Sequence, residues 1–323
     1  MTGQKIRHLF FILMICGIAA ATRAQDKPVH LTQEVGTSFH FVSYGDTRFT
    51  DPADTKASNA PVRQALVKAI AEAHPAFVVI GGDVTYNGND PDDWLVWDKE
   101  TADWRKQGIA VYPAIGNHEM HGDIKIALSN YFQRFPALDH SLYYSVQARN
   151  VLLLVLDSSI DENSGPQHEW LEQQLDHIPA AVDFVVFTLH HPPVTSSHED
   201  SPLGGGHSER PSEQALAAFL EARQKSSRAR FVVLGSHVHN YERHEQGGIT
   251  YFVTGGGGAH AYPIERNPGD PYPDHRINYH YLDVTVDSAG MKFVMNRVEL
   301  VDGKAVWTQP DSVTIHAAAI ASR

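Results

Sequence analysis

Residues 76–88 read AFVVIGGDVTYNG, an apolar run that ends in two glycines, an aspartate and, three positions later, a tyrosine. A short, uninterrupted run rich in valine and isoleucine is typical of a buried strand. The two glycines after it allow a sharp turn or a close approach of the backbone to a ligand. Because a turn alone needs neither Asp83 nor Tyr86, the pair raises the question of what the exit of this strand binds.

Strand-like and helix-like segments alternate along the chain on both sides of this stretch. Further strands are predicted at 38–44, 109–115, 150–156, 183–189, 230–234 and 248–254, and helices at 61–74, 91–107, 166–177 and 211–224. Each helix starts at or next to a proline, which suits the first helical turn. The tail at 279–287 and 291–300 alternates like two antiparallel strands. This order predicts an α/β fold, namely a four-layer α/β/β/α sandwich with two mixed sheets.

The first 24 residues predict a secretory signal. Basic residues precede an apolar stretch from Leu9 to Ala21, which is short for a bilayer span, and small residues precede Gln25. Cleavage is expected after Ala24, with Ala21 as the alternative. We therefore expect a single mature domain, 25–323, that is periplasmic or secreted and has no membrane segment.

Cysteine content and charge narrow the classes of protein. The only cysteine, Cys16, lies in the predicted signal, so the mature chain is expected to form no disulfide and no thiolate metal site. Lipid attachment at Cys16 is the alternative, but the bulky Ile15 before it disfavours this. The net charge of -12 without a basic run disfavours binding of long nucleic acids.

Five of the predicted strands end in residue types that bind metals. Ligands of α/β sheets gather beyond the carboxyl ends of the strands, so these endings are expected to converge. They are YGDTR (44–48), GGDVTY (81–86), GNHE (116–119), LHHPP (189–193) and SHVHNYER (236–243).

The donor atoms in these endings favour two metal ions. Carboxylates, imidazoles, one amide and one phenol, without a thiol, suit iron, zinc or manganese. The donors are too many for one ion, whereas two ions sharing a carboxylate would use them all. Taken singly, Asp46 could be a turn residue, and His237 with His239 a polar pair on an extended segment. Their joint occurrence after apolar runs favours the metal site.

In this order the motifs resemble those of the calcineurin-like metallophosphoesterases, and among them the purple acid phosphatases. The resemblance covers nearly the whole mature chain, from Asp46 to the YER at 241–243. Ordinary members begin with Asp-x-His, but position 48 is arginine here. Purple acid phosphatases lack that histidine and carry a tyrosine three residues after the bridging aspartate, which is the place of Tyr86.

The resemblance implies a metal-binding role for each matched residue. The first ion, Fe3+, would be held by Asp46, Tyr86 and His239. The second, a divalent Zn2+, Mn2+ or Fe2+, would be held by Asn117, His190 and His237. Asp83 would bridge both ions. His118 matches the histidine that contacts the substrate, and Glu119 is expected to orient it.

Two departures from the family pattern leave alternatives open. Arg48 stands where purple acid phosphatases commonly have glycine, and it either reaches the substrate phosphate or forms a structural salt bridge. In the loop at 190–213, predicted to be mobile, the family has one or two proton-donating histidines. His191, His198 and His207 compete for this role, and spacing favours His198.

The implied function is acid phosphatase activity on small phosphomonoesters through a metal-bridging hydroxide, with His118, His198 and Arg48 acting on the substrate. The first alternative is a phosphodiesterase or nucleotide hydrolase on the same scaffold. The second is an inactive secreted metal-binding module. The sequence leaves open the physiological substrate, the divalent ion and the oligomeric state.

Overall fold

The computed structural model describes residues 28–203 and 207–318. The predicted signal segment, with Cys16, lies outside these residues. Within them, no helix has the length and apolar character that a membrane crossing requires.

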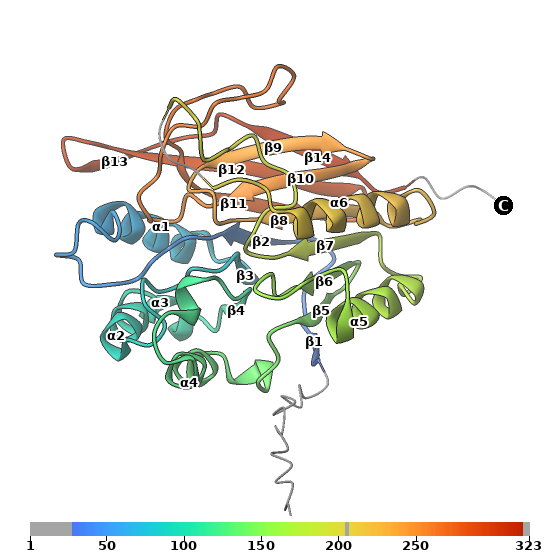
Figure 1. Cartoon of the computed structure of the whole chain (residues 1–323), viewed down its shortest axis with the longest axis horizontal. Coiled ribbons are helices and arrows are strands. Elements are labelled where there is room, and N and C mark those ends of the chain that lie inside the picture. The colour runs from blue at the N-terminus through green and yellow to red at the C-terminus, as the bar shows by residue number, and fades with distance from the viewer. Residues whose placement is uncertain (1–27, 204–206, 319–323) are drawn as a thin grey trace, which may run out of the picture.

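Two mixed sheets form the centre of the fold, which confirms the predicted α/β class (Figure 1). The first sheet runs β1 (His30–Thr32), β5 (Tyr144–Ala148), β6 (Val151–Val155), β7 (Phe184–Thr188), β8 (Arg230–Gly235), β10 (Ile249–Thr254) and β9 (Tyr241–Gln246). The second runs β13 (Lys304–Thr308), β12 (Gly290–Val301), β11 (Tyr279–Val286), β2 (Phe39–Tyr44), β3 (Phe77–Ile80) and β4 (Ala110–Pro113), with β14 (Ser312–His316) also paired to β12.

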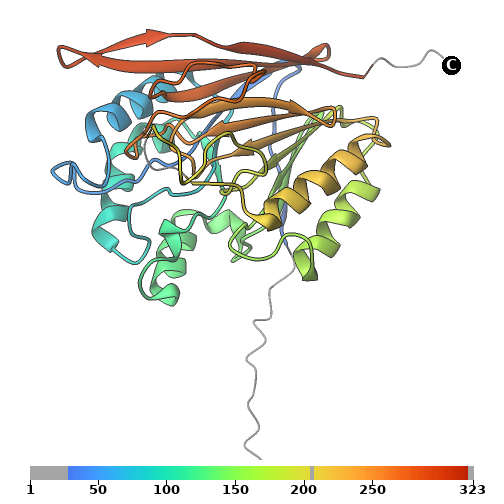
Figure 2. The ribbon, with the colours of Figure 1, turned by 45° about the horizontal axis from the view of Figure 1, so that its top comes forward.

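The helices are grouped on two sides of these sheets (Figures 1 and 2). One group contains α1 (Ala60–Ala73), α2 (Pro91–Glu100), α3 (Ala102–Lys106) and α4 (Ile124–Arg134), and the other contains α5 (Gly165–Asp176) and α6 (Pro211–Gln224). Prolines occupy the first turn of α1, α2, α5 and α6, as their sequences predict.

Strand β6 shows why the apolar runs are continuous. Val151, Leu153 and Val155 join the larger core, which includes the contact between the sheets, where Phe252 and Phe293 stack with ring centroids 4.5 Å apart. The alternate residues of β6 pack instead with α5 and α6. A strand buried on both faces has no polar side, so it carries no alternation.

The predicted helix at 91–107 is interrupted at Thr101. Both the amide and the hydroxyl of Thr101 donate to the carbonyl of Trp97, at 3.0 and 2.6 Å. A threonine hydroxyl that bonds back to the preceding turn bends a helix, and here the chain separates into α2 and α3. The tryptophans of this region still pack together, with Trp97 and Trp104 at 5.9 Å between ring centroids.

Arg63 on α1 fixes the loop that follows β2. Its guanidinium is fully buried and donates to Glu100 through Nε at 3.0 Å and to the carbonyl of Arg48 at 3.0 Å. It also donates to the carbonyl of Thr50 at 3.2 Å. One side chain therefore satisfies a partly buried acid and two backbone acceptors beside the strand end that carries Asp46.

We expect Arg63→Met to lower the free energy of unfolding by about 3–5 kcal/mol, because it removes the guanidinium from the largely buried Glu100 carboxylate and leaves it with the neutral Gln64 amide at 3.0 Å. Urea unfolding followed by circular dichroism measures this loss. Lys68→Met, an exposed position on the same helix, is the control and should cost under about 1 kcal/mol. Equal costs for both substitutions would contradict the role of Arg63.

Candidate metal centre

Neighbouring parallel strands of the second sheet deliver two aspartates to one place. Asp46 follows β2 and Asp83 follows β3, which pair in parallel. Both side chains are fully buried. With His239, which follows β8, they offer ligand atoms that all lie within 4.8 Å of one another.

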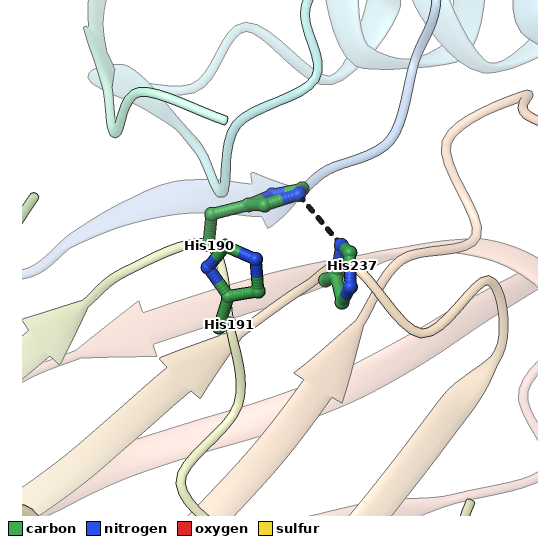
Figure 3. A group of neighbouring side chains, drawn as sticks. All are labelled: His190, His191 and His237. Carbon is green, nitrogen blue, oxygen red and sulfur yellow. Dashed lines mark hydrogen bonds between the residues drawn. The ribbon is translucent and has the colours of Figure 1, made fainter. Parts of the chain in front are cut away.

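The first sheet delivers histidines to the same place. His190 follows β7 and His237 follows β8, and Nε2 of His190 lies 3.0 Å from Nδ1 of His237 (Figure 3). His191 completes a second group whose possible ligand atoms lie within 4.8 Å of one another. The two groups meet because Nε2 of His190 is also 3.4 Å from Oδ1 of Asp83. The predicted convergence of strand ends is therefore present in the structure.

Several potential ligand atoms surround one nitrogen of His190. Its Nδ1 donates to the carbonyl of Gly81 at 2.9 Å, so a neutral ring has a lone pair on Nε2. That lone pair faces Oδ1 of Asn117 at 3.0 Å, besides the atoms of His237 and Asp83 just described. Electron-pair donors that converge in this way fit a bound cation.

His239 and Asp46 repeat this arrangement. Nδ1 of His239 donates to the carbonyl of His260 at 2.8 Å, and Nε2 lies 3.5 Å from Oδ1 of Asp46. Burial, followed by the charge of Arg48, lowers the pKa of His239 to about 4, so its ring is neutral near pH 7. Nε2 of His239 and Oδ1 of Asp46 are both buried without a hydrogen-bond partner. A cation between them would satisfy both atoms.

Glycines keep space for the ligating side chains. A Cβ atom at Gly116 would lie 2.3 Å from Oδ1 of Asp83, and one at Gly255 would lie 2.6 Å from Oδ2 of Asp46. These distances are too short for any side chain larger than hydrogen. The glycine of GNHE is thus required by the position of Asp83.

Backbone strain is concentrated at the same residues. Asp46, Arg48, Asp83 and His237 have φ of 55°, 44°, 50° and 67°, and they are four of the nine non-glycine residues with positive φ in the described ranges. Such conformations cost roughly 1–3 kcal/mol each and cluster at functional sites. The strain places two carboxylates and an imidazole at one point.

Glu119 binds the backbone around Asp83 instead of orienting His118, which is the role that the sequence led us to expect. Its carboxylate accepts from the amides of Asp83 and Gly116, both at 2.9 Å, and from the amide of Thr85 at 3.1 Å. Burial, with the nearby charge of Asp83, raises the pKa of Glu119 to about 8, against the amides that favour the carboxylate.

His118 and Tyr86 lie side by side at the border of the centre. Nδ1 of His118 donates to the carbonyl of Tyr86 at 2.6 Å, which leaves Nε2 3.8 Å from Oδ2 of Asp83. Burial lowers the pKa of His118 to about 4. The Tyr86 ring lies 5.4 Å from the His118 ring, and the residue is 38 % exposed. The structure thus brings six of the predicted ligands together and places the ring of Tyr86 next to His118.

Arg48 reaches into the centre and forms the salt bridge that was one of its two predicted roles. Its Nη2 lies 3.3 Å from Oδ2 of Asp83, while its Nε is buried without a partner. Its charge also helps to lower the pKa values of His118 and His207. Arg48 therefore adds a fixed positive charge to the centre.

Of the three loop histidines, two reach the centre and His198 does not. His198, which spacing favours, is 49 % exposed in its side chain, with Nε2 3.7 Å from Oε2 of Glu265. The rings of His191 and His207 lie 4.3 and 3.9 Å from that of His237. In this structure His207 lies beside His237, whereas His198 lies beside Glu265.

Comparison with known proteins matches most of this chain to one family. The family described as calcineurin-like phosphoesterase matches residues 40–241. Purple acid phosphatase 23 of Arabidopsis thaliana is 29 % identical over 136 residues, which are 40 % of this chain and 28 % of that protein. The chain therefore aligns with less than a third of the length of this relative.

Two solved structures share the fold. A purple acid phosphatase from yellow lupin (Lupinus luteus) seeds superposes with a TM-score of 0.63 at 19 % identity, covering 87 % of this chain and 54 % of the lupin chain. GAP50, the anchor in the inner membrane complex of Plasmodium, superposes with a TM-score of 0.59 at 13 % identity, covering 87 % and 90 % of the two chains. At these identities the likeness concerns the fold alone.

We expect Glu119→Gln to weaken metal binding about 10- to 100-fold, because the new amide group would face backbone donors behind Asp83. Calorimetric titration of the apoprotein with Zn2+ measures the change. Glu169→Gln, an exposed position on α5, should leave the affinity unchanged. Wild-type affinity in Glu119→Gln would show that this support is dispensable.

Proposed function

This chain belongs to the calcineurin-like phosphoesterase family, and we propose that it is a binuclear metallophosphatase that hydrolyses small phosphomonoesters. The observation that carries the proposal is the Asp46–His239 pair, whose facing oxygen and nitrogen are both buried without a hydrogen-bond partner beside further donor atoms of Asp83, His190 and Asn117.

The proposed ligands divide between two neighbouring positions. Asp46, His239 and Tyr86 would hold one ion, and Asn117, His190 and His237 the other. Asp83 lies between them, with its carboxylate close to His190 on one side and grouped with Asp46 and His239 on the other. Two ions bound here would lower the pKa of a water and neutralise charge on a phosphoryl group.

The residues around the metal ligands supply further groups for the substrate. His118 directs Nε2 toward the centre, because its Nδ1 is committed to the carbonyl of Tyr86. Arg48 presents a guanidinium, whose planar fork suits phosphate oxygens. Together they would bind and orient a phosphoryl group. His207, which packs on His237, would take the place that spacing assigns to His198.

We assign ferric iron to the position beside Tyr86, and Zn2+, Mn2+ or Fe2+ to the other. A phenolate is a hard oxygen ligand that a trivalent ion favours, because the ion lowers the pKa of a bound hydroxyl. The periplasmic or secreted location is proposed from residues 1–24 alone. The oligomeric state is left open.

Two other functions compete with this proposal. A phosphodiesterase or nucleotide hydrolase would use the same ligands, and the negative net charge does not oppose small nucleotides. An inactive module is the second, since an anchor protein shares the fold. The gathering of six of the seven predicted ligands favours catalysis.

We expect Asp83→Asn to lose both metal ions and more than about 100-fold of the turnover of a phenyl phosphate monoester. The amide cannot supply two anionic oxygens to two cations. Metal analysis of the purified protein measures the first effect and a rate assay the second. Asp92→Asn, an exposed position on α2, should change neither. A wild-type protein that hydrolyses the matching diester faster than the monoester would favour the phosphodiesterase.

We expect the iron-loaded protein to show a visible phenolate-to-iron charge-transfer band that Tyr86→Phe abolishes. Tyr262→Phe is the control, because the Tyr262 hydroxyl accepts from the amide of His239 and so also lies near the centre. Absorption spectra with metal analysis measure the effect. A colourless, fully active dizinc protein would refute the ferric assignment.

A further inference from the structure

The segment after β7 is fastened to the edge strand β9. The Thr195 hydroxyl donates to Oε1 of Glu242 at 2.5 Å, and the Ser196 amide donates to Oε2 of the same carboxylate at 2.6 Å. Glu242 is fully buried. Burial alone would raise the pKa of its carboxyl, but hydrogen bonds and nearby cations outweigh burial and lower this pKa. Hydrogen bonds to an ionised carboxylate are stronger than those between neutral groups.

His244 lies between two carboxylates. Side chains alternate along β9, so His244 shares a face with Glu242. Its Nε2 lies 3.0 Å from Oε2 of Glu242, and its Nδ1 lies 3.5 Å from Oδ1 of Asp270. A carboxylate only accepts, so a ring that faces carboxylates on both nitrogens carries both protons and is an imidazolium. A neutral ring would turn one lone pair toward an anion.

Asp270 extends the connection to the loop after β10. It accepts from the Ser196 hydroxyl at 2.6 Å. Arg266 of the same loop has Nη1 3.8 Å from Oε2 of Glu242. We call this cluster the clasp, and its members are Thr195, Ser196, Glu242, His244, Arg266 and Asp270. With His244 protonated, its two anions and two cations balance.

The clasp connects to the metal centre through Thr195. The amide of Thr195 donates to Oε1 of Glu209 at 2.8 Å, which ties together the two arms of the loop. His207 precedes Glu209 by two residues, and its ring lies 3.9 Å from that of His237. A displacement of Thr195 would therefore move His207 relative to the metal ligands.

We propose that the clasp is a pH-dependent tether that holds His207 at the metal centre, with protonated His244 as its positioning residue. The charged groups that face His244 are Glu242 on its own strand and Asp270 and Arg266 on the loop after β10. Loss of the His244 proton leaves an excess negative charge in a buried cluster. The consequence for substrate rests on the proposed function, but the tether itself does not.

The direction of the pH effect follows from the pKa of His244. Burial lowers this pKa, but the hydrogen bond to Glu242 and the charges of Glu242 and Asp270 outweigh burial and raise it above its usual value. A raised pKa in the folded state means that the contribution is complete below the ordinary histidine pKa of about 6.5. It is lost as the pH rises through the raised value. The tether is therefore more stable at acidic pH than at alkaline pH.

Hydrogen exchange of the full-length protein tests the tether without reference to activity. Once the intrinsic pH dependence of exchange is divided out, protection of the Thr195 and Ser196 amides should fall at alkaline pH in the wild type. His244→Gln should lower it about tenfold or more already at pH 6, because a bond to a charged group is lost. His244→Lys keeps a positive charge and should stay protected to higher pH. The control is His316→Gln, at the exposed end of β14.

Wild-type protection in His244→Gln would overturn the tether, and so would loss of protection at the same pH in the wild type and in His244→Lys.

Rates with a phenyl phosphate monoester test the link between the tether and the metal centre. There, His244→Gln should lower kcat/KM about 10- to 100-fold at pH 6, mainly through KM, and His244→Lys should restore it. An unchanged KM despite lost protection would overturn the link. Absence of turnover in every variant would refute the proposed phosphatase, while the exchange result would still decide on the tether.

Discussion

The orientation of three imidazoles by backbone carbonyls is the constraint on which the centre depends. His118, His190 and His239 each donate Nδ1–H to a main-chain oxygen, from Tyr86, Gly81 and His260. This bond fixes the tautomer and directs Nε2 inward. The carbonyls belong to strand ends and to the loop after β10, so ring orientation is a property of the sheet arrangement. The bond of His190 to Gly81 joins the two sheets, so movement of one sheet relative to the other would misdirect the His190 ring.

Much of the fold and most of the candidate ligands could be predicted from the sequence. Apolar runs such as the one that forms β6 identify strands buried on both faces, and prolines mark the starts of four helices. Asp46, Asp83 and His190 could be predicted as metal ligands because each of them follows such an apolar run. Parallel strands deliver their carboxyl ends to one edge, so order along the chain was enough to predict proximity.

The remaining features depend on tertiary partners that spacing does not encode. Strand β9 was missed because its buried face carries Glu242 and His244, which read as solvent-exposed until their partners are known. Which loop histidine reaches the centre depends on tertiary contacts such as that of Thr195 with Glu209, two residues after His207. The role of Glu119 likewise follows from three backbone amides, which any residue other than proline supplies.

The opposite face of β9 links the centre to the end of the described chain. The Tyr241 hydroxyl and the Arg243 guanidinium both bond to Asp311, just before β14. The amide of His237 bonds to Asp46, 191 positions earlier. Contacts of such separation form late, because a long loop must close first. During biosynthesis, therefore, Asp46 cannot meet the amide of His237 until the chain between them has been made, and an ion that needs ligands from both positions would bind only after that point.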